Sequence, residues 1–294
     1  MRKYYFSLII LALFLSGCDG KPSEASNSAK QNLQTFGNYK SCYDEFNETK
    51  FKKTDIFCES FVVIDQTTIM DANLQKNLLD KIEPLFVIGN AFTVAKFSTF
   101  SQNRYTSIVV DGYIEKPLTA DEENDVPRNK LNKIKECFNQ KVKTVNSDIK
   151  SGIKQALSES SSTLARSELF KSFQDLADSR IKQSNAREKI VILASDMLEN
   201  SSISSFYANG GESVRKIEPE EELKKVKQAG LLADFKGAKI YVIGAGLLAK
   251  QNRQDTGRDV QTMINLKKFW EMYFSASNAQ LVAFGSPELL ENIH

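Results

Sequence analysis

Short runs of apolar residues alternate along this chain with longer segments in which apolar residues recur at helical spacing. The run Phe61–Ile64 leads into Asp65 without polar alternation, which is typical of a strand buried on both faces of a sheet. Further strands are predicted over residues 189–194, 238–244 and 280–284. Helices are predicted over residues 71–83, 129–157, 164–176, 220–235 and 260–276.

Two segments rich in β-branched and aromatic residues, 91–99 and 105–114, predict a hairpin closed by the polar turn Ser101–Arg104. The outer strand of this hairpin is expected near the edge of the sheet. Elsewhere helices alternate with apolar strands, which favours parallel pairing. The pattern therefore predicts an α/β fold: a doubly wound, mostly parallel sheet with one antiparallel edge strand and helices on both faces.

The intervening segments predict less regular structure. Residues 116–128 are expected to form a loop framed by Pro117 and Pro127, and residues 197–219 a long irregular stretch. The run 158–162, SESSS, interrupts the helical pattern and supplies N-cap residues for the next helix. The tail, residues 287–293, is expected to form a short helix.

The first residues have the features of a signal peptide. Two basic residues precede an apolar stretch, Phe6–Leu15, that is too short to span a bilayer. The stretch ends in Leu15–Cys18, LSGC, which resembles the lipobox of bacterial lipoproteins. The resemblance implies cleavage after residue 17 and a lipid on Cys18, so that the membrane is one partner. Asp19 resembles a signal for retention in the inner membrane, with the protein on its periplasmic side.

This reading divides the chain into a signal peptide (1–17), a tether (18–38) and one large domain (39–294, core 60–285). The tether is rich in Ser, Asn, Lys and Gly, which is typical of linkers. Arg2 and Lys3 account for the formal net charge of +2, so the remaining chain is balanced. A balanced chain lacks the basic face that nucleic acid requires, and no nucleic-acid partner is expected.

Cysteine and histidine usage limits the chemistry further. With Cys18 assigned to the lipid, Cys42, Cys58 and Cys137 allow three different single disulfides, and the sequence does not choose among them. A disulfide suits an oxidising periplasm. The only histidine is His294, the last residue, which argues against histidine-dependent nucleophilic catalysis and histidine-based zinc sites.

Carboxylates and hydroxyls follow two of the predicted strands. Asp65 and Thr67 follow the first strand, and Asp196 follows the strand at 189–194. If both strands are central, both carboxylates lie at the same edge of the sheet, where ligands bind in folds of this class. Oxygen ligands without nitrogen or sulfur suit a hard cation such as Mg²⁺.

These residues give the chain a resemblance to the von Willebrand factor A family over most of residues 60–285. That family binds protein partners through a metal site, the MIDAS, built from an Asp-x-Ser/Thr-x-Ser turn, a Thr in a later loop and an Asp after the fourth strand. The resemblance implies Asp65, Thr67, Thr163 and Asp196 as ligands of Mg²⁺ or another divalent cation, with Ser161 or Ser162 as alternatives to Thr163. The chain departs from the family at Ile69, which replaces the second hydroxyl, and at Met197, which replaces a common glycine.

Two enzyme-like patterns in the sequence offer alternatives to this interpretation. A strand followed by Asp65 also resembles phosphohydrolases of the haloacid dehalogenase type, in which that Asp is the nucleophile, but Thr67 stands in place of the second acid. The run Gly244–Ala249 matches a dinucleotide fingerprint, but no helix follows at once and no acid closes a second strand. We therefore expect no nucleotide and, as the main reading, no enzymatic activity.

Aromatic residues complete the set of candidates. Phe269, Trp270 and Phe274 lie at helical spacing and are predicted to belong to the core. Phe206 and Tyr207 lie in the polar stretch near the expected ligand edge, where aromatic side chains often anchor partners, although core packing is the alternative. The sequence therefore predicts a lipid-anchored domain that binds another protein.

Overall fold

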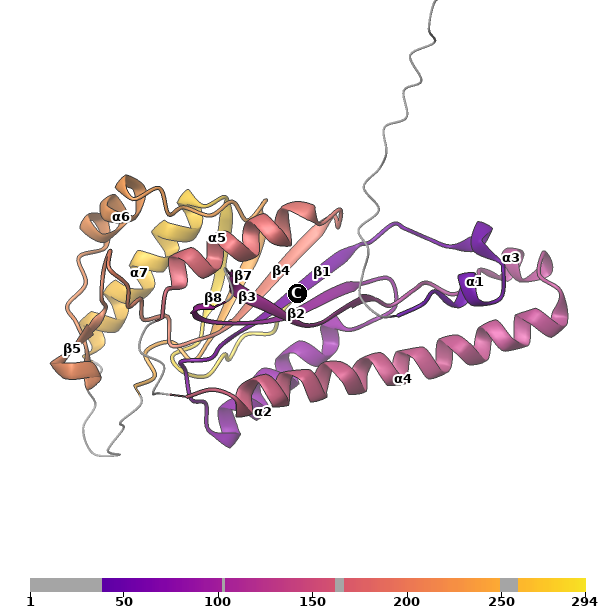
Figure 1. The fold of residues 1–294 in the computed structure, drawn as a ribbon, viewed down its shortest axis with the longest axis horizontal. Helices are drawn as coiled ribbons and strands as arrows, with labels where there is room; N and C mark the ends of the chain where they lie inside the picture. The colour runs from indigo at the N-terminus through magenta and orange to yellow at the C-terminus, as the bar shows by residue number, and fades with distance from the viewer. Residues whose placement is uncertain (1–38, 102–103, 162–166, 249–258) are drawn as a thin grey trace, which may run out of the picture. The chain divides into compact units, whose positions relative to one another are not determined.

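The computed structural model describes residues 39–101, 104–161, 167–248 and 259–294 (Figure 1). The predicted lipidation site Cys18, Asp19 and the predicted ligand Thr163 lie outside these residues. The strands of the main sheet are β1 (Cys58–Asp65), β2 (Ala91–Ser101), β3 (Arg104–Tyr113), β4 (Glu188–Ala194), β7 (Ala238–Ile243) and β8 (Ala279–Phe284). The principal helices are α2 (Ala72–Ile82), α4 (Arg128–Ser158), α5 (Leu169–Ser179), α6 (Pro219–Gln228) and α7 (Val260–Ala276).

The six strands lie in the order β3-β2-β1-β4-β7-β8, and only β2 and β3 pair antiparallel. The predicted α/β class, the parallel sheet and the antiparallel edge strand are confirmed. Strands β1, β4 and β7 end at one edge of this sheet, which we call the carboxyl edge, and begin at the opposite amino edge. Because β1 and β4 are neighbours at the centre, whatever follows each of them meets at the carboxyl edge.

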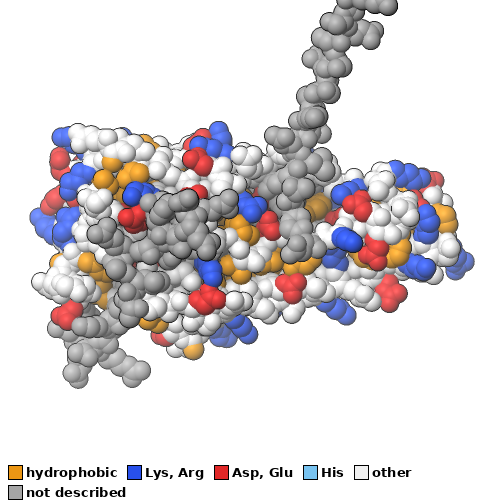
Figure 2. Space-filling model, in the orientation of Figure 1, with side chains coloured by type: hydrophobic (Ala, Val, Ile, Leu, Met, Phe, Trp, Pro, Cys, Tyr) orange, Lys and Arg blue, Asp and Glu red, His pale blue; other side chains and the backbone are white. Residues whose placement is uncertain are grey.

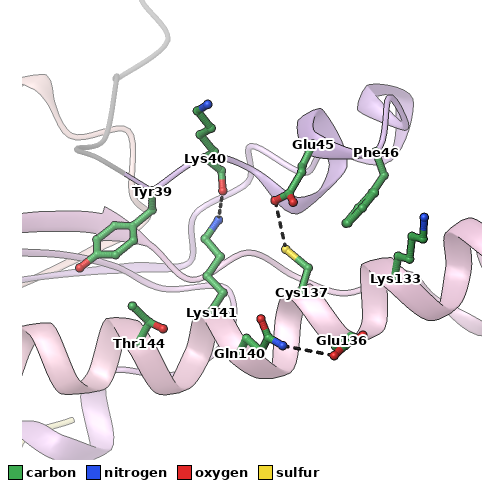
Figure 3. Close-up of a pocket in the computed structure, with 10 residues that line it drawn as sticks. All are labelled: Tyr39, Lys40, Glu45, Phe46, Lys133, Glu136, Cys137, Gln140, Lys141 and Thr144. Carbon is green, nitrogen blue, oxygen red and sulfur yellow. Dashed lines mark hydrogen bonds between the residues drawn. The ribbon is translucent and has the colours of Figure 1, made fainter.

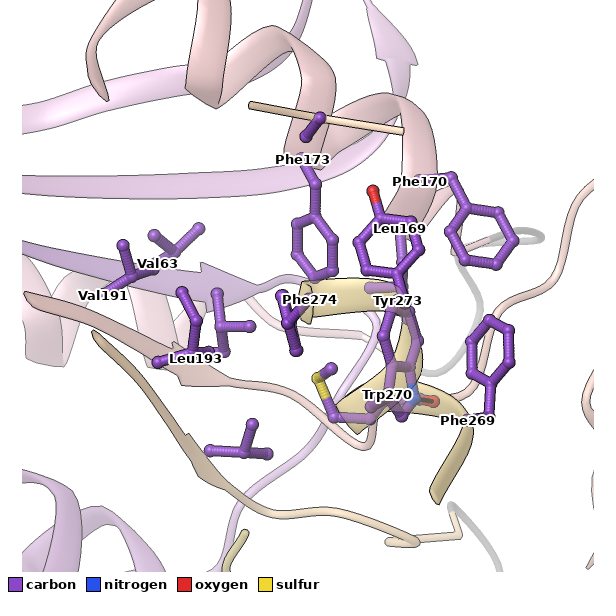
Figure 4. Packing of buried hydrophobic residues seen from close by; sticks show 14 of the residues in the cluster. Val63, Leu169, Phe170, Phe173, Val191, Leu193, Phe269, Trp270, Tyr273 and Phe274 are labelled. Atoms are coloured by element: carbon purple, nitrogen blue, oxygen red, sulfur yellow. Dashed lines mark hydrogen bonds between the residues drawn. The ribbon is translucent and has the colours of Figure 1, made fainter. Parts of the chain in front are cut away.

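Strand β1 is buried along its whole length because helices cover both of its faces. Alternate residues serve opposite faces: Phe61 and Val63 pack with α5, α6 and α7, whereas Val62 and Ile64 pack with α2 and α4. The first face is filled mainly by aromatic rings of α5 and α7 (Figure 4). Phe269, Trp270 and Phe274 are fully buried there, which confirms the core prediction for these three residues.

Helix α4 has 31 residues, and its rise of about 1.5 Å per residue makes it about 46 Å long. Only its C-terminal part, from Val142, packs against the sheet. The N-terminal part extends past the sheet and packs against α1 (Cys42–Glu45) and the segment around α3 (Ala120–Asn124), as Figure 1 shows. A disulfide joins Cys42 to Cys137 on α4, and Cys58 is a buried free thiol, so the structure selects one of the three predicted pairings.

Three local predictions were wrong. The segment 116–128 contains α3, because the side chain of Thr119 and that of Glu122 form a capping box that starts a helical turn. Helix α6 ends at Gln228 and not at residue 235, because Gly230 adopts a positive φ of 67°. The tail 287–293 forms no helix.

The shorter elements complete the described chain. The stretch 197–219 is mostly irregular, as predicted, but it contains a small antiparallel hairpin of β5 and β6. Single helical turns connect several of the longer elements. These shorter elements are η1 (Thr49–Phe51), η2 (Glu83–Leu85), η3 (Ile181–Gln183), β5 (Tyr207–Ala208), η4 (Asn209–Gly211) and β6 (Ser213–Val214).

Candidate functional site

Asp65 is the last residue of β1, and its side chain has no exposed surface. One carboxylate oxygen accepts hydrogen bonds from the amide (2.9 Å) and the hydroxyl (2.6 Å) of Thr67. The other oxygen accepts from the hydroxyls of Ser195 (2.7 Å) and Ser167 (3.3 Å). Four neutral donors therefore replace the water that this carboxylate loses on burial.

Asp196 follows β4 by two residues and is 4% exposed. Its amide donates to the hydroxyl of Thr68, 3.0 Å away, so the turn after β4 is bound to the turn after β1. One carboxylate oxygen accepts from the amide of Leu198 at 2.9 Å. The other accepts from the phenol of Tyr207 at 2.5 Å. The two acids meet at the carboxyl edge, as the strand pattern predicts.

The two carboxylates affect each other's protonation. Burial raises the pKa of Asp65, and hydrogen bonds from Thr67 and Ser195 oppose that rise. Burial and, second, the charge of Asp65 raise the pKa of Asp196 well above its ordinary value, against the hydrogen bond from Tyr207. Burial also raises the pKa of Tyr207, so the phenol remains a donor at neutral pH. Two like charges at buried, adjacent positions require a compensating proton or cation.

The loop after α4 reaches the same edge. The amide of Ser161 donates to the carbonyl of Gln66 (2.8 Å), and the side-chain amide of Gln66 donates to the carbonyl of Ala156 (2.6 Å). The expected loop ligand Thr163 and its alternative Ser162 lie outside the described residues. Ile69, which stands in place of the family's second hydroxyl, is 53% exposed at this edge.

The interpretation of Phe206 as a partner-binding residue is wrong for this structure, because Phe206 has no exposed surface. Its ring lies 5.1 Å from that of Phe269, within the aromatic core. Tyr207, the next residue, begins β5 and turns its hydroxyl towards Asp196. The sequence interpretation also missed Ser167 and Ser195, whose hydroxyls reach Asp65 from other segments.

The run 158–162 was predicted to supply the N-cap of the next helix, but it does not cap α5. Helix α5 begins at Leu169, and the N-cap residue Glu168 makes no side-chain cap hydrogen bond. Instead the carboxylate of Glu199 accepts from the amide of Phe170, 3.2 Å away. Burial raises the pKa of Glu199 to about 8, although the hydrogen bonds it accepts oppose the rise. A carboxyl group brought in from the segment after β4 thus replaces a local cap.

A shallow depression of about 600 Å³ lies elsewhere, along the N-terminal part of α4 beside Cys137 (Figure 3). Lys141 crosses it and donates to the carbonyl of Lys40 (2.8 Å) and to the carboxylate of Glu115 (2.9 Å). The depression has side chains of both charges, as does the visible surface of the molecule in Figure 2. Gln140 bonds to Glu136, and Lys141 is already paired, so these groups are occupied. The depression lies apart from the carboxyl edge.

The haloacid dehalogenase alternative needs an accessible nucleophile. Asp65 is fully buried, and both of its oxygens accept hydrogen bonds. A phosphoester could not approach either oxygen in this arrangement, and Thr67, in place of the second acid, donates to Asp65. The geometry does not favour this reaction.

A scan against protein-family models and a search of the curated proteins found no match for this chain. Within the described residues, no three side chains of His, Cys, Asp or Glu are gathered as a metal-binding group. In that same part of the chain, no helix has the length and apolar character needed to cross a membrane. The assignment of a partner, a cation and a membrane anchor therefore rests on the residues themselves.

Proposed function

We propose that this chain is a membrane-tethered, periplasm-facing binding domain whose partner is another protein that docks on the carboxyl edge. One observation carries the proposal. Asp65 and Asp196, from strands far apart in the sequence, meet at the carboxyl edge with almost no exposed surface. Buried charges that are not needed for folding are costly, and their concentration at a ligand-binding edge is typical of a functional site.

A divalent cation, with Mg²⁺ as the first candidate, is proposed to offset the two charges. The available donors are carboxylate and hydroxyl oxygens, from Asp65, Thr67 and Asp196, and such donors fit a hard cation that retains some of its water. When bound, the cation supplies a positive charge that an acidic side chain of the partner can coordinate. Ile69, exposed at the same edge, offers an apolar contact beside that charge.

The cation is tested by titrating Mg²⁺ or Mn²⁺ into the metal-free protein in a calorimeter. We expect binding heat from the wild-type chain and an affinity reduced by more than about tenfold in Asp65→Asn, because the site loses one of two negative charges. The fluorescence of Trp270 gives a second measurement. Its indole donates to the carbonyl of Met197 (2.9 Å), next to Asp196, and it is the only tryptophan in the chain.

Tyr207→Phe is the matched control, because it alters the same site but leaves both carboxylates in place. This variant should retain the binding heat, since the phenol only donates to Asp196. No heat from the wild-type chain, or equal heat from Asp65→Asn, would remove the cation from the proposal and leave the docking edge to be tested with partners directly.

The membrane tether is tested separately by cell fractionation. If Cys18 carries a lipid, the wild-type chain should sediment with membranes, and Cys18→Ser should shift most of the protein to another fraction. The expected change is large because covalent lipid supplies the membrane affinity that the described residues do not obtain from a spanning helix. A Cys18→Ser chain that still sediments fully with membranes would contradict lipid anchoring.

A further inference from the structure

Three large apolar side chains are exposed together at the amino edge, opposite the carboxylate pair. They are Phe57 (52% exposed), Val87 (49%) and Ile88 (52%). Phe57 immediately precedes β1, and the other two lie in the segment that precedes β2. The amide of Phe57 donates to the carbonyl of Gly89 at 3.4 Å, which brings the two segments side by side. We call these three residues the amino-edge patch.

The described chain begins next to this patch. The ring of Tyr39 lies 6.3 Å from that of Phe92, and the ring of Phe92 lies 5.9 Å from that of Phe86. Phe86 directly precedes Val87, and Phe92 is the second residue of β2. Twenty-one residues, 18–38, separate Tyr39 from the predicted lipid, and they can reach at most about 70 Å. A lipid on Cys18 would therefore keep the domain within this distance of the bilayer, attached through the end of the chain that lies near the amino edge.

Positive charge borders the patch. The side chain of Lys116 lies against Gly89, since a Cβ added to Gly89 would be only 2.7 Å from it. Arg187 lies beside the other segment, because its amide donates to the carbonyl of Ile56 and its side chain is 66% exposed. Both cations pair with the single carboxylate of Asp55, at 3.8 Å and 3.0 Å. Glu188, whose amide donates to the carbonyl of Phe57, pairs with Lys239 at 3.5 Å. These three cations and two acids leave one net positive charge, which attracts anionic headgroups.

We propose that the amino-edge patch inserts into the headgroup region of the bilayer that carries the lipid, so that the carboxyl edge faces away from the membrane. The proposal rests on the tether proposed above. Exposed apolar side chains bordered by Lys and Arg are the composition of interfacial membrane contacts. In this orientation the carboxyl edge is open to a soluble or membrane-projecting partner.

The test places a tryptophan at each edge of the lipidated full-length chain. Ile88→Trp and Ile69→Trp are a matched pair, since the two isoleucines are 52% and 53% exposed at opposite edges. Each chain is incorporated into vesicles of phosphatidylethanolamine and phosphatidylglycerol with brominated acyl chains, which quench tryptophan that enters the bilayer. We expect several-fold greater loss of fluorescence from Ile88→Trp than from Ile69→Trp. Trp270, which is fully buried, contributes the same background to both.

Flotation of the vesicles separates the two proposals. If the wild-type chain floats but Cys18→Ser does not, the tether is supported, and the quenching then reports the orientation alone. Equal quenching at the two edges in a floating chain overturns the orientation but leaves the tether standing. The same result is expected if the patch binds a protein and not the bilayer. A wild-type chain that does not float overturns both. Val87→Trp provides a second probe of the patch if Ile88→Trp does not fold.

Discussion

Removing the disulfide between Cys42 and Cys137 is expected to lower the free energy of unfolding by about 2–5 kcal/mol. The bond closes a loop with a sequence separation of 95 residues, and a loop of that length restricts the unfolded chain strongly. In the folded state it also fixes the four-residue helix α1 to the part of α4 that extends past the sheet. Urea unfolding of the Cys42→Ser, Cys137→Ser double variant, followed by circular dichroism, measures the loss.

Two controls isolate the contribution of the bond. Treatment of the wild-type chain with a reducing agent should reproduce the midpoint of the double variant. Cys58→Ala removes a buried thiol that forms no disulfide, so it should cost only about 1 kcal/mol from lost packing. A double variant as stable as the wild-type chain would contradict the expectation. It would mean that the apolar contacts around α1 and α3 hold this region without the bond.

The sequence could not predict which two cysteines form the disulfide. A disulfide requires two Cα atoms within about 7 Å, and those of Cys42 and Cys137 are 6.0 Å apart. That proximity depends on where α4 lies past the end of the sheet, which no local pattern encodes. Cys58 begins the central strand β1 with its thiol buried, so the fold places it away from the other two.

The sheet was predictable because its signals are local and repeated. Each parallel strand is a short apolar run, and each helix is a segment with apolar residues on one face, so their alternation determines the class of fold. The two strands of the edge hairpin differ from the rest in lacking a helix between them, which predicts their antiparallel pairing. Element ends were less predictable where one residue decides them, as Thr119 does for α3.

The candidate site was predictable only in part. The positions of Asp65 and Asp196 follow from the ends of two apolar strands. Ser195 directly follows the same strand as Asp196, so its place at the carboxyl edge was predictable, but its bond to Asp65 was not. Ser167 could not be assigned, because it lies before α5 in a segment that no strand end places at this edge. Phe206 and Tyr207 point in different directions because successive residues of an extended segment face opposite sides. That alternation places Phe206 in the core and Tyr207 at Asp196. It is the sequence signal that could have distinguished the two aromatic residues.

Glu199 was not identified from the sequence, and its burial leads to a testable pH dependence. Because its pKa is raised to about 8 in the folded state, its protonated form is favoured there. Its contribution to stability is therefore complete below its ordinary pKa of 4.5 and is lost as pH rises through about 8. The loss should be on the order of 4 kcal/mol. Glu199→Gln, which stays neutral and can still accept from the amide of Phe170, should lose far less stability over this range.

The measurement is the difference in unfolding free energy between the wild-type chain and Glu199→Gln from pH 4.5 to pH 8.5. Metal-free buffer is required, because raised pKa values at Asp65 and Asp196 give a slope of the same sign and a bound cation would change it. Taking the difference removes that shared slope. Asp234→Asn is the control: its partner Lys236 lowers the pKa of Asp234 from 3.8 to about 2, so its contribution is lost only at pH values below this range and its difference from the wild-type chain should stay constant. Parallel curves for the wild-type chain and Glu199→Gln would show that Glu199 ionises in the folded protein as freely as in the unfolded chain.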